Sequence, residues 1–328
     1  MQKHKGIVVL TTLPSDSHSR NLIFMQLLLG EMGYEVGAIQ HIQSVVLSEL
    51  QNYANQHGFK QIMPLLLSPI TDPLNHSVYS ADIKYEEKNL KLTASMIFHK
   101  QLALMSPSIE KLYIVSPNIR LEKRKVKSSS NHLLEFSQFD MEIQNASMHE
   151  VMDFVEMLFK HTIKAVKAQC ESELQLLGRE LLDWDEPFER ITTIGDSRSE
   201  DEICQEVTNS SSAPAFVTSF KKEFYDLEDP NAVGIYRNFD LIYPEGYGES
   251  LSGAEREYEY NSIVRRMEEL GMDFEPYENY LSLAKLNHIP KTAGGGLGIQ
   301  RLIKFITGKR NIADVCLFDR SVESPFTF

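Results

Sequence analysis

A glycine-rich segment near the C-terminal end, residues 293–301, restricts the fold of this chain more than any other feature. Positions 294–296 and 298 are all glycine, so the backbone there can approach a flat ligand or a crossing strand very closely. Apolar side chains then follow at helical spacing as far as Gly308, which predicts a helix with Arg301 in its first turn, directed back across the glycines. A guanidinium group can stack on a base and bind phosphate oxygens. The segment therefore predicts the floor of a ligand pocket, with a glycine-rich turn beside a surface arginine as the alternative.

The length and charge of the chain limit its class and its partners. It has 328 residues, of which 42% are hydrophobic, so it can bury the core of one large domain or of two smaller ones. Its formal net charge is −13, whereas a protein that holds a long polyanion usually presents a basic face. The one basic cluster in the sequence, residues 123–127, suits a triphosphate better than a nucleic acid.

Apolar runs and cysteines exclude further classes. The apolar run at residues 7–10 is too short for the core of a signal peptide or for a membrane span, so we expect a cytoplasmic protein without a membrane partner. The three cysteines, Cys170, Cys204 and Cys316, lie far apart and have no cysteine or histidine at the spacing of metal ligands. They predict neither a zinc site nor a disulfide framework.

The first third of the chain predicts a long helix, a strand and a shorter helix. Residues 40–58 carry an apolar stripe at helical spacing, and residues 59–64 follow as a strand that ends at a proline. Residues 68–76 are a turn-rich segment that either closes over a ligand or only connects two elements. Ser95 is placed to cap the next helix, and Lys100 lies one turn into it.

An antiparallel hairpin is predicted next, because residues 111–118 and 132–142 alternate apolar and polar side chains on either side of a charged, serine-rich loop. Its polar face is expected to line a site, although a solvated strand face is the alternative. The side chains of this hairpin that can bind a ligand are Arg120, Glu122, His132, Phe136 and Asp140.

The region after the hairpin predicts peripheral structure and then two more strands. Residues 149–178 predict one long amphipathic helix, and residues 179–212 predict an irregular insertion rather than a second catalytic unit. Strands are expected at residues 214–219 and 235–243.

Two carboxylates, Asp240 and Glu249, are expected on adjacent antiparallel strands. Such a pair suits Mg²⁺ when it faces a triphosphate, because this ion takes a few protein oxygens and completes its octahedron with phosphate and water. Arg256, considered alone, predicts a pair with a neighbouring carboxylate. The neighbours in question are Glu255, Glu257 and Glu259.

The order of these features resembles the class II aminoacyl-tRNA synthetases, and most closely their aspartyl/asparaginyl branch. The helix and strand that end at Pro64, the hairpin of residues 111–142 and the Gly-x-Gly-x-Gly-x-x-Arg frame of residues 294–301 are similar to the three signatures of that class. The resemblance implies an α+β fold in which a central antiparallel sheet is flanked by helices. It also implies a catalytic domain at residues 39–328 and a homodimer formed through the first signature. Residues 1–38 are then a segment packed on that domain, with no anticodon-binding barrel.

The resemblance further implies ATP as a ligand and Mg²⁺ as a cofactor. Arg120 matches the residue that grips the α-phosphate, Glu122 the one that bonds the adenine amino group, and His132 the one that reaches the outer phosphates. Phe136 matches the ring that stacks on adenine opposite Arg301. The glycines of the nucleotide floor are Gly296 and Gly298, and the matched magnesium ligands are Asp240 and Glu249.

An amino-acid site is implied beside the nucleotide. Lys100 and Arg256 match residues that hold substrate carboxylates, Asp140 matches the residue that takes the ammonium group, and Ser252 falls beside the reacting centre. Ser95 is the remaining candidate for substrate binding. A lysine at position 100 indicates aspartate as the substrate, since the asparaginyl branch has an acidic residue there.

Departures from the family pattern indicate a different acceptor. Ile97 stands where aspartyl-tRNA synthetases have glutamine, and the loop at residues 123–131, which meets tRNA in those enzymes, is longer than expected. With the Thr-Asp-Pro-Leu segment at residues 71–74, the sequence is more similar to the archaeal asparagine synthetases of this branch. We therefore expect an AMP-forming ligase, independent of tRNA, that adenylates the β-carboxylate of aspartate and transfers it to ammonia.

Two alternatives stay open. One is an aspartate-adenylating ligase that acts on another amine, a carrier or tRNA. The other is a catalytically silent paralogue that binds a nucleotide, for which Gln300 is a small indication because relatives usually have glutamate there.

Overall fold

The computed structural model describes residues 31–74, 76–123, 131–220, 223–322 and 324. The apolar run at residues 7–10 and most of the basic cluster at residues 123–127 lie outside these ranges. The first described helix, α2 (Glu31–Gln56), runs without a break across the domain boundary expected after residue 38. The division of the chain at that point stays a prediction.

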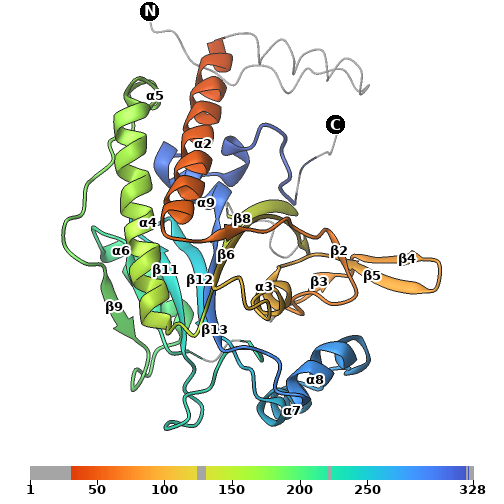
Figure 1. The fold of residues 1–328 in the computed structure, drawn as a ribbon. Coiled ribbons are helices and arrows are strands. Elements are labelled where there is room, and N and C mark those ends of the chain that lie inside the picture. The colour runs from red at the N-terminus through yellow and green to blue at the C-terminus, as the bar shows by residue number, and fades with distance from the viewer. Residues whose placement is uncertain (1–30, 75, 124–130, 221–222, 323, 325–328) are drawn as a thin grey trace, which may run out of the picture.

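An eight-stranded sheet forms the centre of the fold, in the order β1-β6-β8-β13-β12-β11-β10-β9 (Figure 1). Its inner pairs are all antiparallel, whereas β1 and β9 join the two edges in parallel. The strands are β1 (Lys60–Gln61), β6 (Lys111–Ile119), β8 (Glu135–Gln144), β13 (Thr292–Gly298), β12 (Gly248–Glu255), β11 (Asn238–Tyr243), β10 (Ala215–Thr218) and β9 (Glu189–Thr192). The α+β fold with a central antiparallel sheet is confirmed, as is the hairpin between β6 and β8.

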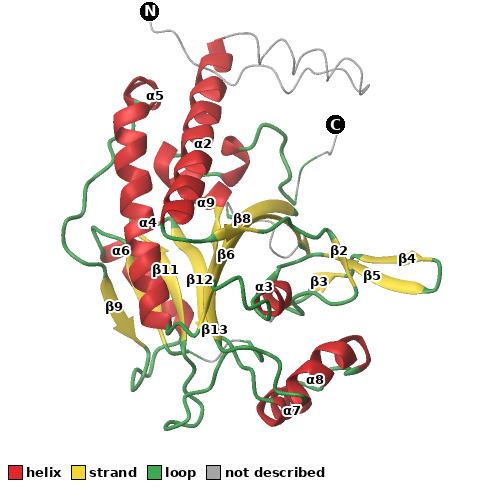
Figure 2. Cartoon of the chain, viewed as in Figure 1, coloured by secondary structure: helices red, strands yellow, loops and turns green. Residues whose placement is uncertain are grey.

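Helices cover one face of this sheet, to which the alternate apolar residues of β8 point. Phe139 and Met141 of β8 are fully buried there in the main core, together with apolar residues of the covering helices. The two longest described helices, α2 and α4, pack against each other, and Figure 2 shows α4 in front of the strands. The covering helices are α2, α4 (Met148–Gln169), α5 (Glu171–Leu177) and α9 (Ile299–Thr307). None of the helices in the described ranges is long and apolar enough to cross a membrane.

Smaller elements surround the opposite face and the ends of the sheet. A second core joins α3 to α7 and α8, and a third joins α6 to β10 and β11. A hairpin of β4 and β5 projects from the body of the molecule (Figure 1). These helices are α3 (Ile97–Ala103), α6 (Glu200–Ser210), α7 (Tyr260–Glu269) and α8 (Glu278–Lys285), with short 3-10 helices η3 (Glu275–Tyr277) and η4 (Ile312–Val315). The short strands are β2 (Leu67–Ser68), β3 (Val78–Tyr79), β4 (Asp82–Tyr85), β5 (Lys88–Leu92) and β7 (Leu121–Glu122).

The structure corrects three expectations about elements. The long helix expected at residues 149–178 is broken at Cys170, which leaves the helical region with φ −125° and ψ 32°. The insertion expected to be irregular at residues 179–212 contains β9 and α6. The side chains of β9 do not alternate between buried and exposed, so its sequence carries no strand pattern. The start of α6 could have been predicted from the capping box that Ser199 and Glu202 form. The strand expected at residues 59–64 is reduced to the two residues of β1.

Candidate active site

Polar side chains collect on the face of the sheet that the long helices leave uncovered. Asp140 of β8 pairs with Gly296 of β13, which pairs with Ser252 of β12. Residues paired across antiparallel strands share a face, and residues two apart on one strand share it too. Glu142 and Gly294 therefore belong to the same surface, one step further along β8 and β13.

The glycines of β13 leave room for the side chains of β8 to lean across the sheet. A Cβ atom at Gly294 would lie 2.1 Å from the carbonyl oxygen of Met141 and 2.3 Å from Oε2 of Glu142. At Gly296 it would lie 2.9 Å from Oδ1 of Asp140. Larger residues at these positions would collide with the acidic side chains, so the glycines shape the surface from which those carboxylates act. The helix expected after the glycines is α9, and Gly308 ends it in the left-handed conformation, as predicted.

A first cavity of about 520 Å³ opens above this surface. It is lined by the whole set of residues that the sequence assigned to nucleotide binding. Those residues are Arg120, Glu122, His132, Phe136, Gly296, Gly298 and Arg301.

Glu122, on β7, has a buried carboxylate of which only one oxygen is hydrogen-bonded to a described residue. Its side chain is 3% exposed, and Oε1 lies 2.9 Å from Nε2 of His76. No described residue donates a hydrogen bond to its buried Oε2. Buried carboxylate oxygens are normally hydrogen-bonded, so this atom is suited to a donor from a ligand in the cavity.

The aromatic ring of Phe136 lies beside a different arginine from the one expected. The Arg120 guanidinium carbon is 5.2 Å from the ring centroid, and its Nε donates to the carbonyl oxygen of Ala94 at 3.2 Å. Nη1 of Arg301 instead donates to the carbonyl oxygen of Glu249 at 3.0 Å and to its Oε1 at 3.2 Å. Both arginines line the same cavity as the ring, so a flat ligand there meets one apolar and two cationic planes.

His132 lies in this cavity as a largely neutral ring at neutral pH. Burial lowers its pKa below the usual value, and the positive charge of Arg301 lowers it further. The imidazole is therefore suited to donate one neutral N–H hydrogen bond rather than to act as a cation.

A second cavity, of about 670 Å³, adjoins the first. The two share a wall, to which Arg120, Ser252 and Gly296 belong. All the residues that the sequence assigned to amino-acid binding line the second cavity. Those residues are Ser95, Lys100, Asp140, Ser252 and Arg256.

Buried charges connect Lys100 and Arg256, which lie 156 positions apart in the sequence. Nζ of Lys100 is 2.9 Å from Oδ1 of Asp140 and 3.6 Å from Oε2 of Glu142. Nε of Arg256 is 3.0 Å from Oε1 of the same Glu142. Burial alone would lower the pKa of Arg256, but the carboxylate of Glu142 more than offsets this, and the pKa is raised. The alternative in which Arg256 pairs with a neighbouring glutamate is therefore wrong.

Two predicted residues are placed differently from expectation. Ser95 does not cap α3, because the N-cap is Met96; the Ser95 hydroxyl instead accepts a hydrogen bond from the Ile97 backbone at 3.2 Å. Asp240 is buried on β11 opposite Ser252, on the same face of the sheet, but it lines neither cavity. Glu249 lines both.

Comparison with known proteins identifies the family. A family model described as "tRNA synthetases class II (D, K and N)" matches residues 26–322. The chain belongs to this family.

Individual relatives agree with the resemblance found in the sequence. The chain is 31% identical over 305 residues to an aspartate–tRNA(Asp/Asn) ligase of Methanopyrus kandleri, covering 87% of this chain and 68% of the relative. It is 27% identical over 308 residues to an asparagine–tRNA ligase of Pyrococcus abyssi, covering 88% and 69%. The structure superposes on the asparaginyl-tRNA synthetase of Pyrococcus horikoshii in complex with asparaginyl-adenylate with a TM-score of 0.79. That match has 22% identity and covers 95% of this chain and 75% of the other, and it shows a shared fold.

The structure also places at the site residues to which the sequence analysis assigned no role. Glu142 carries the same signal as Asp140, since it lies two positions further along the strand, but it was not assigned a role. Asp72 lies in the turn-rich segment expected at residues 68–76, and its Oδ2 accepts a hydrogen bond from the hydroxyl of Tyr225 at 3.1 Å. Asp72 lines the second cavity, as does Asp226, whose Oδ1 is 3.9 Å from Nη1 of Arg256. Glu142 is fully buried and does not line the cavity itself, but it pairs with Lys100 and Arg256, which do. No sequence pattern links residues so far apart.

We expect alanine substitutions at two glycines, one packed between β13 and β8 and one exposed on α2, to change the stability of the protein in opposite directions. Gly294→Ala places a methyl group against the Met141 carbonyl oxygen, and we expect it to lower the free energy of unfolding by about 1–3 kcal/mol. The matched control is Gly37→Ala on the exposed side of α2, which has no atom within 4 Å of the added Cβ and should be stabilising by about 0.5–1 kcal/mol. Urea unfolding followed by circular dichroism measures both, and equal stability of the two variants would contradict the close approach.

Proposed function

We propose that this chain is an AMP-forming ligase that adenylates the β-carboxylate of aspartate and transfers the acyl group to ammonia, forming asparagine. The observation that carries the proposal is the shared wall of the two cavities. Arg120 and Gly296 belong to both, so a nucleotide in the first cavity and an amino acid in the second would meet beside a fixed cation.

The first cavity suits the adenosine part of ATP. Oε2 of Glu122 supplies a buried acceptor for the adenine amino group, and Phe136 supplies a ring face. Arg120 reaches the shared wall, where it can stabilise charge on the α-phosphate during transfer. Arg301 is positioned to cover the base once it leaves its pair with Glu249.

Mg²⁺ fits the carboxylate of Glu249, which is 42% exposed on the wall that the cavities share. Asp240, one strand away on the same face, is the second proposed ligand. When bound, the ion would neutralise phosphate charge and orient the leaving pyrophosphate.

The second cavity suits a dicarboxylic amino acid. Lys100 and Arg256 both contact Glu142, so their charged groups lie close enough to bind one carboxylate of the substrate from two sides. Asp140 can accept a hydrogen bond from the substrate ammonium group. If Lys100 and Arg256 hold the α-carboxylate, the β-carboxylate faces Arg120. Ile97 lines this cavity without any polar group to bind an amide.

The chemistry requires two displacements and no protein nucleophile. A β-carboxylate oxygen attacks the α-phosphorus of ATP, the bond to the bridging oxygen breaks, and pyrophosphate leaves. Ammonia then attacks the acyl carbon, AMP leaves with the electron pair of the acyl–oxygen bond, and the nitrogen loses a proton. Positioning and electrostatic stabilisation are the main contributions of the protein.

The charges on the walls of the second cavity favour an amine as the acceptor of the acyl group. They carry five acidic side chains and three basic ones. The acidic ones are Asp72, Asp140, Glu223, Asp226 and Glu249, and the basic ones are Lys100, Arg120 and Arg256. An excess of carboxylates attracts ammonium and can take up the proton that it must lose before attack.

A second candidate function is transfer of the acyl group to tRNA. The names of the relatives from Methanopyrus kandleri and Pyrococcus abyssi favour it. The net charge of −13 is the feature that favours a small acceptor instead.

A product assay separates these functions. The protein is incubated with ATP, Mg²⁺ and either aspartate or asparagine, and pyrophosphate, AMP and amino-acid products are measured with ammonium, with other amines and with tRNA. We expect aspartate-dependent pyrophosphate release and asparagine only when ammonium is present. Aminoacylated tRNA without free asparagine would support the second candidate, and ATP binding by calorimetry without turnover would support a silent nucleotide-binding paralogue.

Glu122 offers a direct test of the nucleotide site. Glu122→Gln keeps the size of the side chain but removes its charge, and we expect the KM for ATP to rise about tenfold or more, because hydrogen bonds to charged groups are worth about 1.5–3 kcal/mol. The control is Glu135→Gln, whose side chain is 58% exposed at the start of β8. An unchanged KM for ATP in Glu122→Gln would remove this residue from the adenine contact.

The homodimer implied by the family stays a proposal, supported by an exposed apolar patch next to β1. Its exposed members are Met63 at 78%, Leu65 at 47%, Leu66 at 51% and Leu67 at 45%. Apolar side chains gathered in this way commonly mark an interface. We expect sedimentation to give a dimer that Leu66→Glu dissociates, because a charge in an apolar interface is costly. Leu286→Glu, at a position 62% exposed beyond α8, should leave the dimer intact, and a wild-type monomer would overturn the proposal.

A further inference from the structure

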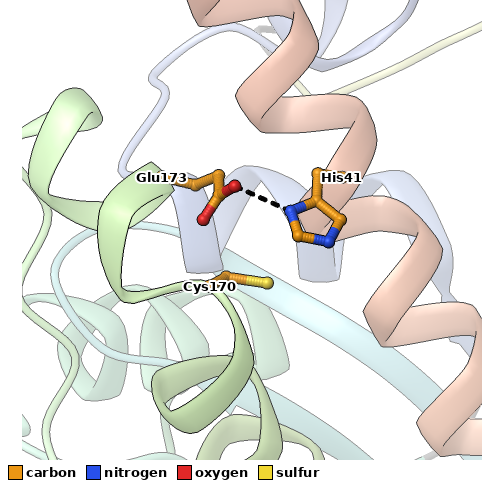
Figure 3. Close-up of side chains that lie close together, drawn as sticks. All are labelled: His41, Cys170 and Glu173. Carbon is orange, nitrogen blue, oxygen red and sulfur yellow. Dashed lines mark hydrogen bonds and ion pairs between the residues drawn. The ribbon is translucent and has the colours of Figure 1, made fainter.

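Three metal-binding side chains meet on the helical side of the sheet, away from the two cavities (Figure 3). His41 comes from α2, Cys170 from the junction of α4 and α5, and Glu173 from the first turn of α5. Their ligand atoms all lie within 4.8 Å of one another. Within the described ranges, this is the one group of three or more such residues that is close enough to hold an ion.

The break in the helix at Cys170 creates the cluster. α4 ends at Gln169 and α5 begins at Glu171, so the regular helix is interrupted at the cysteine, and Glu173 lies on the short second helix beside α2. There Oε1 of Glu173 lies 2.7 Å from Nδ1 of His41.

The cluster is closed on one side and open on the other. Cys170 is fully buried, whereas the His41 side chain is 50% exposed and that of Glu173 is 20% exposed. An ion can therefore arrive from solvent on the imidazole side, bind the sulfur at the base of the cluster and keep a water molecule as its outermost ligand. Three protein ligands and one water molecule make up the four ligands of a tetrahedral zinc ion, and the burial of the sulfur distinguishes it from a reactive surface thiol.

The donor set selects the class of ion. One sulfur, one imidazole nitrogen and one carboxylate oxygen suit zinc, whereas Ca²⁺ and Mg²⁺ prefer oxygen ligands only. Zinc bonds of about 2.0 Å to nitrogen and oxygen and about 2.3 Å to sulfur separate tetrahedral ligand atoms by about 3.5 Å. Shifts of about 1 Å in the side chains would bring the three atoms from their present separations to these values.

We propose that His41, Cys170 and Glu173 form a zinc site, completed by water, that links α2 to the junction of α4 and α5. Binding replaces the hydrogen bond between His41 and Glu173 by bonds to the ion, and the thiol of Cys170 releases its proton to solvent. Because α2 packs on the main core, the ion stabilises the helical layer and takes no part in adenylation.

Cobalt provides the test, because Co²⁺ accepts the same tetrahedral ligands as zinc and absorbs light. The full chain, freed of metal with a chelator, is titrated with Co²⁺. We expect one equivalent to produce the near-ultraviolet band of a thiolate–cobalt bond, zinc to abolish the band by displacement, and zinc to raise the melting temperature. Cys170→Ser should remove the band, and the controls Cys204→Ser and Cys316→Ser, both at partly buried cysteines, should retain it.

Substitutions of the other two ligands keep the proposal testable if Cys170→Ser fails to fold. His41→Ala and Glu173→Gln change residues nearer the surface, and each should weaken Co²⁺ binding about tenfold or more. Adenylation activity should be the same in Glu173→Gln as in the unchanged protein, so failure of the metal site and failure of the proposed ligase are distinguishable. Absence of the thiolate band in the unchanged protein, its persistence in Cys170→Ser, or unweakened Co²⁺ binding in both His41→Ala and Glu173→Gln would overturn the zinc site.

Discussion

The contact of one buried carboxylate, Glu142, with both Lys100 and Arg256 is the interaction on which the rest of the site depends. Removing charges from water is costly, and the cost is offset only when each charge has close partners of opposite sign. Glu142 meets this condition with two cations and with the hydroxyl of Thr292 at 2.8 Å. The same geometry holds the two cations at a fixed separation, as the proposed clamp on a substrate carboxylate requires.

This arrangement of charges requires that β13 carry glycines, without side chains, opposite the acidic residues of β8. A side chain at Gly294 would collide with the Met141 backbone and the Glu142 carboxylate, and one at Gly296 would crowd the ends of the Gln138 and Asp140 side chains. The glycines are thus needed first for packing between strands. Room for a flat ligand is a consequence of that packing, and it explains why the glycine-rich segment and the acidic strand are found side by side.

One sheet serves two purposes because its side chains alternate. Phe139 and Met141 face the core under α2, α4 and α9, whereas Asp140 lines the second cavity and Glu142 holds the two cations that line it. A shift of one residue in the register between β8 and β13 would exchange these sets. Stability and the site are therefore specified by the same strand pairing.

Much of this could be predicted from the sequence because it depends on short-range order. The alternation of residues 132–142 and the glycine frame are local patterns that predicted the hairpin and the glycine-rich floor. The resemblance to the class II synthetases that these motifs carry then implied the fold class and the residues assigned to the two cavities. Contacts between distant parts of the chain carry no such pattern. Only the tertiary structure decided that Arg256 pairs with Glu142, that Asp72 meets Tyr225, and that His41 approaches Cys170, because each depends on where a strand ends or a helix breaks, and those positions are set by packing across the whole core.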